Sequence, residues 1–241
     1  KHPEIILMKN ERNSGTHFTF NRGIQAAKNE FIYGSSADDV ILPGFFEKAM
    51  NLFNKNETLA LVCTDFALFH DQKPYQLQAR KMLPIPSPVI FTPPDFIQML
   101  RKTNFFIPSN TCIYKIKFLQ SFGGYDPKLM SLTDYFLNAQ IAFRHPIGYI
   151  PEALAAYRIA QNSYGQTIRY DWKKRLQLMD YLMQLIFKKE DKQFQKDFVR
   201  SGLLGFNGYF MILYLLIHPT YWRYLPFIIY KVIQRKFEKY E

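Results

Sequence analysis

Residues 13–39 read NSGTHFTFNRGIQAAKNEFIYGSSADD, and they predict a helix, then a buried strand, then two adjacent carboxylates. Phe20, Ile24 and Ala27 recur at helical spacing, and the apolar run 31–33 follows after a short break. Open α/β sheets bind their ligands beyond the carboxyl ends of the strands. An acid pair just past a strand therefore indicates an α/β fold with a ligand site at the edge of its sheet.

Gly23 lies in the interior of the predicted helix. A glycine in the middle of a helix costs about 1 kcal/mol relative to alanine. Such a residue is best explained by a neighbour that approaches the backbone. We therefore expect another group to pack closely against the helix at Gly23.

Asp38 and Asp39 follow the turn-forming Ser35 and Ser36 and precede an apolar run that ends at Pro43. Mg²⁺ and Mn²⁺ prefer oxygen ligands, and Mg²⁺ is commonly held by one or two carboxylates together with substrate phosphates. The alternative is a solvated turn before a helix opened by Pro43, because Asp and Pro suit those positions. On the two acids alone the turn is favoured, since Asp is common in turns.

The order of residues across the whole stretch changes that balance. An Asn-x-Gly, a second Asn-x-Gly followed by Ile, an Ala, a strand and an Ala-Asp-Asp occur in this order. The pattern resembles the central signature of the family 2 glycosyltransferases, which have the GT-A fold. The matching positions are Asn13, Gly15, Asn21, Gly23, Ile24, Ala27, Phe31, Ile32, Ala37, Asp38 and Asp39.

This resemblance implies a GT-A-like, Rossmann-type sheet with flanking helices and a nucleotide-diphosphate sugar as donor. It implies that Asp39 binds a divalent metal, Mg²⁺ or Mn²⁺, and that Asp38 contacts the ribose or completes the metal shell. The residues expected at the donor through the resemblance are Asn13, Gly15, Asn21, Gly23, Asp38 and Arg158.

Asp134 is the candidate catalytic base. It lies in the first turn of a predicted helix whose apolar face includes Leu137 and Ile141. Without other evidence, such a carboxylate would only complement the helix dipole, which stabilises the helix by about 0.3 to 1 kcal/mol. However, it follows the turn 123–126, which resembles the family's Gly-Gly-Phe-Asp-like turn. That resemblance places Asp134 at the Asp of the family's Glu-Asp motif, the general base, with Thr133 in place of the Glu.

Tyr157 and Arg158 resemble the start of a Tyr-Arg-x-His pattern found in the family. A guanidinium suits bidentate phosphate contacts, so Arg158 is a candidate partner of the leaving diphosphate. The alternative is a surface salt bridge, because Arg is mostly exposed. Ala160 stands at the His position and cannot ligate a metal, and the loop that contains Asn162 and Ser163 is expected to close over the site.

The family normally begins with a further segment that carries the first strand and the turn that binds the nucleotide base. We therefore expect this chain to be N-terminally incomplete, because a parallel sheet without its central strand exposes apolar edges. The apolar run 5–8 is predicted to be a strand. The proline-rich segment 69–94 is predicted to be irregular. It resembles the variable region that lies over the acceptor site in the family.

Cys63 and Cys112 lie in apolar, strand-like runs and lack CxxC spacing. They are predicted to be buried free thiols, which indicates a reducing compartment. Asp65 ends the first of these runs and is predicted to lie in a turn.

The composition changes near residue 167. Residues 167–241 hold 14 Lys and Arg against 7 Asp and Glu, and 203–217 is almost entirely apolar. This run is too short to cross about 30 Å of hydrocarbon as a helix. Together with the aromatic and basic residues of 221–236, it suits a helix lying in the membrane interface. The alternative is a helical subdomain that packs on the sheet.

These features predict a GT-A-like domain, residues 1–165, and a helical, basic extension, residues 166–241. The predicted function is inverting transfer of a sugar from a nucleotide-diphosphate donor to a hydroxyl of a glycan or lipid-linked acceptor, in cell-envelope polysaccharide biosynthesis. The predicted location is cytoplasmic, with contact to the inner face of the membrane through 201–236. Two alternatives remain: a non-catalytic membrane-surface scaffold with this fold, and a nucleic-acid-binding protein, for which no recognition motif is present.

Overall fold

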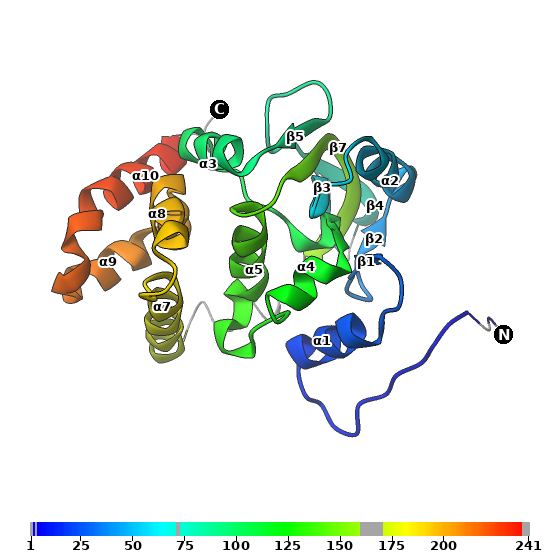
Figure 1. The fold of residues 1–241 in the computed structure, drawn as a ribbon, viewed down its shortest axis with the longest axis horizontal. Helices are drawn as coiled ribbons and strands as arrows, with labels where there is room; N and C mark the ends of the chain where they lie inside the picture. Colours follow the sequence, from blue (N-terminus) through cyan, green and yellow to red (C-terminus); the bar gives the residue numbers. More distant parts are fainter. Residues whose placement is uncertain (1, 3, 71–72, 160–170, 238–241) are drawn as a thin grey trace.

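The computed structural model describes residues 2, 4–70, 73–159 and 171–237. The strands gather on one side of the molecule and the C-terminal helices on the other, with helix α5 (Thr133–Ala142) between them (Figure 1). Helix α1 (Thr16–Ala26) lies beneath the strands, and the N-terminal segment extends away from the body (Figure 1). The predicted α/β architecture with a helical C-terminal part is confirmed.

The sheet is mixed. Its main order is β1-β6-β3-β7-β2, with β4 paired to β3 and β5 paired to β7. The long neighbours β3 and β7 run parallel, whereas the other pairs are antiparallel. The strands are β1 (Phe31–Tyr33), β2 (Val40–Ile41), β3 (Leu61–His70), β4 (Lys73–Arg80), β5 (Val89–Phe91), β6 (Ile113–Lys115) and β7 (Ile147–Ile159).

The helices divide into those around the sheet and those of the C-terminal cluster. The first group comprises α1, α2 (Phe45–Lys55), α3 (Pro93–Lys102), α4 (Ile116–Ser121), α5, and the short 3-10 turns η1 (Ser109–Thr111) and η2 (Pro127–Leu132). The second comprises α7 (Trp172–Ile186), α8 (Lys192–Ser201), η3 (Leu203–Asn207), α9 (Tyr209–Ile217), η4 (Pro219–Tyr224) and α10 (Leu225–Phe237).

Three local predictions are wrong. Residues 5–8 form no strand, and Ile5, Ile6 and Leu7 are 69% to 78% exposed, because no neighbouring strand pairs with them. Much of the segment 69–94 is not irregular, since β3 continues to His70, β4 pairs back along it and β5 joins β7. Asp65 lies inside β3 rather than in a turn: its carboxylate is buried and accepts hydrogen bonds from Tyr149 Oη and the Met82 amide.

Two layers of apolar side chains enclose the sheet. Helix α2 covers one face through Phe45 and Phe53, which pack with Val62 and Ile150 from the strands. The larger cluster on the other face joins the sheet to α3, α5 and the C-terminal helices. Cys63 and Cys112 are buried and free, as predicted.

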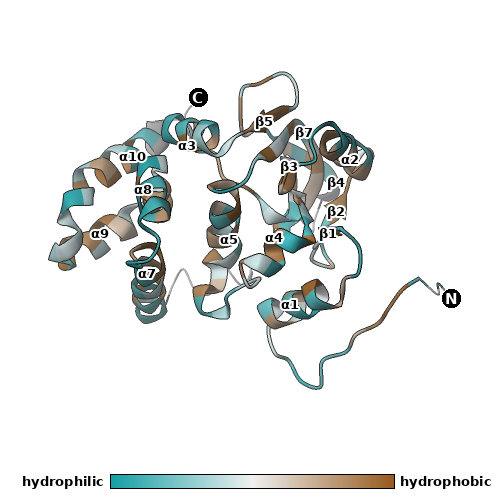
Figure 2. Ribbon diagram, viewed as in Figure 1, coloured by the Kyte–Doolittle hydropathy of each residue, from teal (hydrophilic) through white to brown (hydrophobic). Residues whose placement is uncertain are grey.

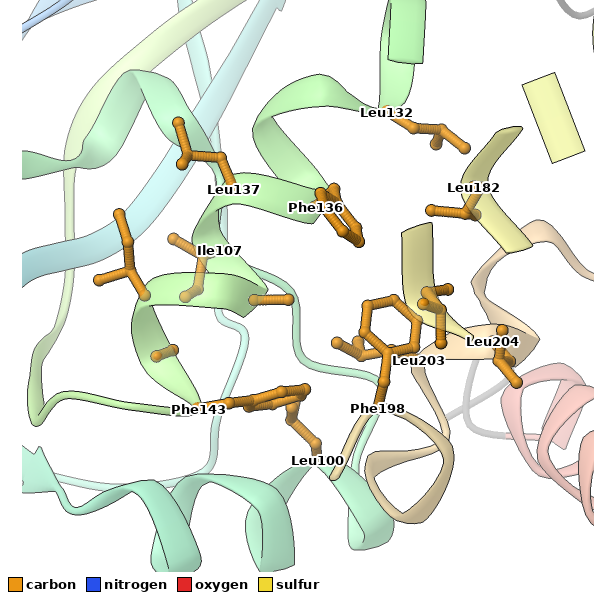
Figure 3. Packing of buried hydrophobic residues seen from close by; sticks show 14 of the residues in the cluster. Leu100, Ile107, Leu132, Phe136, Leu137, Phe143, Leu182, Phe198, Leu203 and Leu204 are labelled. Carbon is orange, nitrogen blue, oxygen red and sulfur yellow. The ribbon is translucent and has the colours of Figure 1, made fainter. Parts of the chain in front are cut away.

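Phe198 of α8 lies at the centre of the larger cluster. Its fully buried ring is 6.3 Å from the ring of Phe136 on α5 and 6.1 Å from that of Phe143, the residue directly after α5, as centroid distances (Figure 3). The helix that carries the candidate base is therefore packed directly against the C-terminal part. One hydrophobic core crosses the predicted boundary at residues 165 and 166, so the division into two domains stays a prediction.

A buried lysine ties the last helix to the rest of the fold. Lys231 of α10 is fully buried, and its Nζ donates hydrogen bonds to the Arg101 carbonyl at 2.8 Å and to Gln234 Oε1 at 2.8 Å. Gln234 Nε2 donates to the Lys102 carbonyl at 3.1 Å. The last carbonyls of a helix lack partners within the helix and carry partial negative charge. Lys231 and Gln234 therefore cap the C-terminus of α3.

Candidate active site

Two of the three predicted acids face the same cavity. Asp39, between β1 and β2, and Asp134, in the first turn of α5, both line a cavity of about 380 Å³. Asn110 from η1 and Tyr157 from β7 line it as well. The fold thus brings together side chains that are far apart in the sequence.

A larger cavity of about 740 Å³ adjoins this one, because Phe20, Ser36 and Tyr125 line both. Asn13, Gly15 and Gly23, three of the residues predicted at the donor, line the larger cavity together with Tyr33 and Tyr114. The two cavities form a pair, one beside the candidate base and one beside the predicted donor residues.

Gly15 and Gly23 differ in what they require. Gly15 has φ of +83°, which is costly for any residue with a Cβ. A Cβ at Gly23 would meet nothing within 4 Å. The prediction that a neighbour packs against Gly23 is therefore wrong: this side of the helix faces the open space of the larger cavity.

Asn21 lines neither cavity. Its Nδ2 donates to the Tyr125 carbonyl at 2.8 Å, and its Oδ1 accepts from the Tyr125 amide at 2.8 Å. A Cβ at the next residue back, Gly124, would lie 2.5 Å from Asn21 Oδ1. Asn21 thus holds the turn that precedes η2 and α5. Its side-chain hydrogen bonds are used for this turn, so contact between Asn21 and a donor stays a prediction.

Asp38 and Arg158 form an ion pair. The Arg158 Nη2 and Nε atoms donate to one oxygen of Asp38 at 2.9 Å and 3.2 Å, and both side chains are partly exposed. The surface salt bridge considered as the alternative for Arg158 is thus present. Arg158 directly follows Tyr157, which lines the cavity, and contact between Arg158 and a diphosphate stays a prediction. Ala160, Asn162 and Ser163 lie outside the described residues.

The pKa of Asp39 is raised to about 6, first by burial and then by the negative charge of Asp38. A cation between the two carboxylates would relieve that repulsion. In the part of the chain that the structure describes, no three His, Cys, Asp or Glu side chains group as metal ligands. Because Mg²⁺ is often held by one or two carboxylates and completed by substrate phosphates, Asp38 and Asp39 fit a metal that arrives with a diphosphate.

Asp134 is held by a directed chain of hydrogen bonds. The Tyr114 hydroxyl donates to Asn138 Oδ1 at 2.9 Å, and Asn138 Nδ2 donates to Ser109 Oγ at 3.2 Å. Ser109 Oγ in turn donates to Asp134 Oδ2 at 3.1 Å, and the Tyr135 amide donates to Oδ1 at 2.8 Å. These donors fix the carboxylate in one orientation and leave it as an acceptor.

Burial raises the pKa of Asp134, while the bonds from Tyr135 and Ser109 oppose the rise by stabilising the charged form. The nearby charge of His17 acts in the same direction as these bonds. The pKa of the Tyr125 phenol, which faces Asp134, is raised by burial and by the Asp134 charge. A partly buried carboxylate with a raised pKa is suited to accept a proton near neutral pH.

Removing the Ser109 hydroxyl is expected to raise the pKa of Asp134 further. A base must be ionised, so activity rises with pH through this pKa, and Ser109→Ala should move the acidic limb of the pH–rate profile to higher pH. Ser131→Ala is the matched control, because Ser131 lines the same cavity. An unchanged acidic limb in Ser109→Ala would show that this bond does not tune the base.

Ser109, Asn110 and Tyr114 were not among the residues predicted at the site. The signal available was a short polar segment, 108–111, between two apolar runs. In the structure Ser109 and Asn110 lie in the 3-10 turn η1, and only 113–115 form the strand β6. A turn at this point is what directs their side chains toward α5.

Solved structures resemble this fold at low sequence identity. The crystal structure of residues 1–349 of TarS from S. aureus, in complex with UDP-GlcNAc, matches with a TM-score of 0.50 and 13% identity, over 83% of this chain and 62% of that one. A mannosyltransferase from Pyrobaculum calidifontis, in complex with GDP-Man and Mn²⁺, has a TM-score of 0.45 and 12% identity, over 96% and 70% of the two chains. The likeness to TarS confirms the GT-A-like α/β fold.

Among curated proteins, an uncharacterised glycosyltransferase of Methanocaldococcus jannaschii is 25% identical over 228 residues, which is 92% of this chain and 72% of the relative. Residues 1–120 match the family model described as Glycosyl transferase family 2. That region contains the Asn-x-Gly repeats and the Ala-Asp-Asp from which the resemblance was drawn. This match confirms the predicted resemblance to glycosyl transferase family 2 over residues 1–120.

Proposed function

We propose that this protein transfers a sugar from a nucleotide-diphosphate donor to a hydroxyl of a glycan or lipid-linked acceptor, with inversion at the anomeric carbon. The observation that supports this most is the placement of Asp39 and Asp134 around one cavity that adjoins a larger one. A nucleotide sugar has a bulky nucleotide and a small sugar joined by a diphosphate. The larger cavity suits the nucleotide, and the acid-lined cavity suits the reacting sugar and its acceptor.

Each polar residue has a distinct role in this proposal. Asp134 accepts the proton of the acceptor hydroxyl as that oxygen attacks the anomeric carbon from the face opposite the diphosphate. Asp38 and Asp39 would hold the divalent metal, which when bound would stabilise negative charge on the leaving diphosphate. Arg158 exchanges its bond to Asp38 for one to the phosphate. A single displacement of this kind inverts the anomeric centre.

Asp39→Ala is expected to weaken metal-dependent donor binding by about tenfold or more, since even a hydrogen bond to a charged group is worth about 1.5 to 3 kcal/mol. The donor is first selected by screening nucleotide sugars for thermal stabilisation in the presence of Mn²⁺. Calorimetry with and without Mn²⁺ then compares wild type, Asp39→Ala and the control Glu152→Ala, whose carboxylate pairs with Lys48 instead. Equal Mn²⁺-dependent affinity in wild type and Asp39→Ala would exclude Asp39 from the metal site.

Donor hydrolysis distinguishes an enzyme from a non-catalytic scaffold. Thr133, in place of an acidic residue, is the feature that favours a scaffold. Slow hydrolysis of the selected donor, with water as acceptor, is expected of an enzyme and absent from a scaffold that only binds. Donor binding without any hydrolysis or transfer would favour the scaffold.

The proposal also includes contact with an anionic membrane surface, in keeping with the predicted cytoplasmic, peripheral location. One face of α9 is buried in the core, but Tyr209, Leu213, Leu216 and Ile217, at helical spacing, are 48% to 63% exposed. Exposed Trp222 lies next to them, with its Nε1 bonded to the Leu216 carbonyl. These five residues are the α9 patch, and helix α9 itself lies at the outer edge of the C-terminal helices (Figure 2).

Charge favours a lipid surface as the occupant of the α9 patch. Residues 198–237 contain no Asp or Glu but include Arg200, Arg223, Arg235 and Lys236. Exposed apolar and aromatic side chains in a segment with cationic and no acidic residues match the interface of an anionic bilayer. No helix in the described ranges is long and apolar enough to cross a membrane.

Leu213→Glu is expected to lower binding to vesicles of mixed phosphatidylglycerol and phosphatidylcholine by roughly tenfold or more, because burying one Leu is worth about 1.5 to 3 kcal/mol. Leu77→Glu on β4 is the matched control, since Leu77 is 43% exposed and lies outside the α9 patch. Co-sedimentation measures the bound fraction. Equal binding of both variants, or none by wild type, would exclude the α9 patch as a membrane contact.

A further inference from the structure

Two buried polar atoms beside the candidate base have no partner within the described part of the chain. They are Asn110 Nδ2 and Thr133 Oγ1, and both residues line the cavity of about 380 Å³ that contains Asp134. Buried polar groups in folded proteins almost always have hydrogen bonds, and an unpaired one costs about 1 to 3 kcal/mol. Two such atoms in one cavity indicate a ligand that supplies their partners.

Their positions in the chain place them on either side of the base. Asn110 directly follows Ser109, whose hydroxyl donates to Asp134, and Thr133 directly precedes Asp134. The backbone around Asn110 is fixed, because its carbonyl accepts a hydrogen bond from Tyr33 Oη at 2.9 Å. Thr133 is 5% exposed at the start of α5. Both side chains are therefore carried by elements that also carry the base and the serine bonded to it.

Aromatic rings form part of the cavity wall. The Tyr157 ring stacks on Phe66 with centroids 5.0 Å apart, and Phe106 packs on the same Phe66 at 5.9 Å. Both Tyr157 and Phe106 line the cavity. Flat aromatic surfaces with a few placed polar groups are typical of small-molecule sites. A sugar ring matches such walls, because it offers C–H faces to the aromatic rings and oxygens at its edges.

We infer that Asn110 and Thr133 bind oxygens of the acceptor that neighbour the attacking hydroxyl, so the acceptor group at this site is a saccharide and not a simple alcohol. The inference rests on the proposed function and specifies its acceptor. The Asn110 amide requires an oxygen that accepts a hydrogen bond. The Thr133 hydroxyl can donate to or accept from a second. A simple alcohol has no oxygen besides the reacting one, and it would leave both atoms unpaired.

The test uses the full chain, the donor found by thermal screening, and two kinds of acceptor probe: a set of methyl hexopyranosides and 1-butanol. Wild type should transfer to at least one methyl hexopyranoside in preference to 1-butanol. Asn110→Ala and Thr133→Val should each raise the KM for that pyranoside by roughly 5- to 10-fold, the usual value of one hydrogen bond. The readout for the variants is this KM, whereas donor hydrolysis by wild type, with water as acceptor, reports separately whether the protein turns the donor over.

Two further variants control for structural effects. Asn207→Ala removes another buried, unpaired amide, which lies in η3 and lines neither cavity, and it should leave the KM unchanged. Thr133→Ser keeps the hydroxyl and should keep the KM near that of wild type. Thermal unfolding of every variant shows whether it is folded.

The outcomes separate this inference from the proposed function. If wild type hydrolyses the donor but the pyranoside KM is unchanged in folded Asn110→Ala and Thr133→Val, buried water satisfies these atoms and the inference is wrong. A preference for 1-butanol, or transfer to none of the pyranosides while hydrolysis proceeds, also overturns it. Absence of both donor hydrolysis and transfer in wild type instead rejects the proposed function itself.

Discussion

Asp134→Asn should lower the rate of sugar transfer by about 10²- to 10⁴-fold, the usual contribution of a positioned general base. The amide has almost the same shape as the carboxylate, and its oxygen can still accept the bond from Ser109. It cannot take a proton from the acceptor. Asp134 does not line the larger cavity, so donor affinity should stay within about twofold of wild type. A group that acts only in the transition state affects the rate and not the binding of the ground state.

The measurement pairs steady-state transfer with calorimetric donor binding on the same protein. Glu47→Gln is the control, because Glu47 is an exposed carboxylate in the first turn of α2 and matches Asp134 in its relation to a helix dipole. Glu47→Gln should leave transfer unchanged. Transfer by Asp134→Asn at the wild-type rate would remove Asp134 from the mechanism and leave it only its place in a helix turn.

Phe198→Ala should reduce the free energy of unfolding by about 3 to 5 kcal/mol, as expected for truncating a buried aromatic ring. The Phe198 ring lies against Phe136 of α5, Phe143 directly after α5, and Phe194 of its own helix. The cavity left behind would lie where the C-terminal helices meet the helix of the candidate base (Figure 3). Transfer activity should fall as well, because α5 would lose part of its support.

Urea unfolding followed by tryptophan fluorescence and circular dichroism provides the measurement. Phe18→Ala is the control, because Phe18 is 47% exposed, and its loss should cost less than about 1 kcal/mol. A single transition with the full loss would show that residues on both sides of position 165 unfold together. Two separate transitions, with Phe198→Ala affecting only one, would instead support the predicted division into two domains.

Elements with strong local patterns could be predicted from the sequence. The helix Thr16–Ala26 follows from the spacing of Phe20 and Ile24, and the strand Phe31–Tyr33 follows from its apolar run. Asp134 lies in the first turn of α5, as predicted. These features depend on neighbouring residues alone, so periodicity and turn signals are sufficient to find them.

Other features depend on what the chain meets in three dimensions. Gly23 was expected to have a packed neighbour, but it faces a cavity, and helical propensity cannot distinguish these cases. Residues 5–8 have the composition of a strand but no partner strand. The chain of bonds to Asp134 through Ser109 and Asn138 joins segments far apart in the sequence, and no local pattern encodes it.

Two hydrogen bonds join the Asn21 side chain to the Tyr125 backbone, so α1 and the turn before η2 are expected to move together. One wall of the larger cavity belongs to α1, and Tyr125 reaches both cavities. A shift of α1 that widens the larger cavity would therefore also move the turn that contains Tyr125. A change in the width of the larger cavity is consequently expected to alter the smaller cavity that contains Asp134 as well.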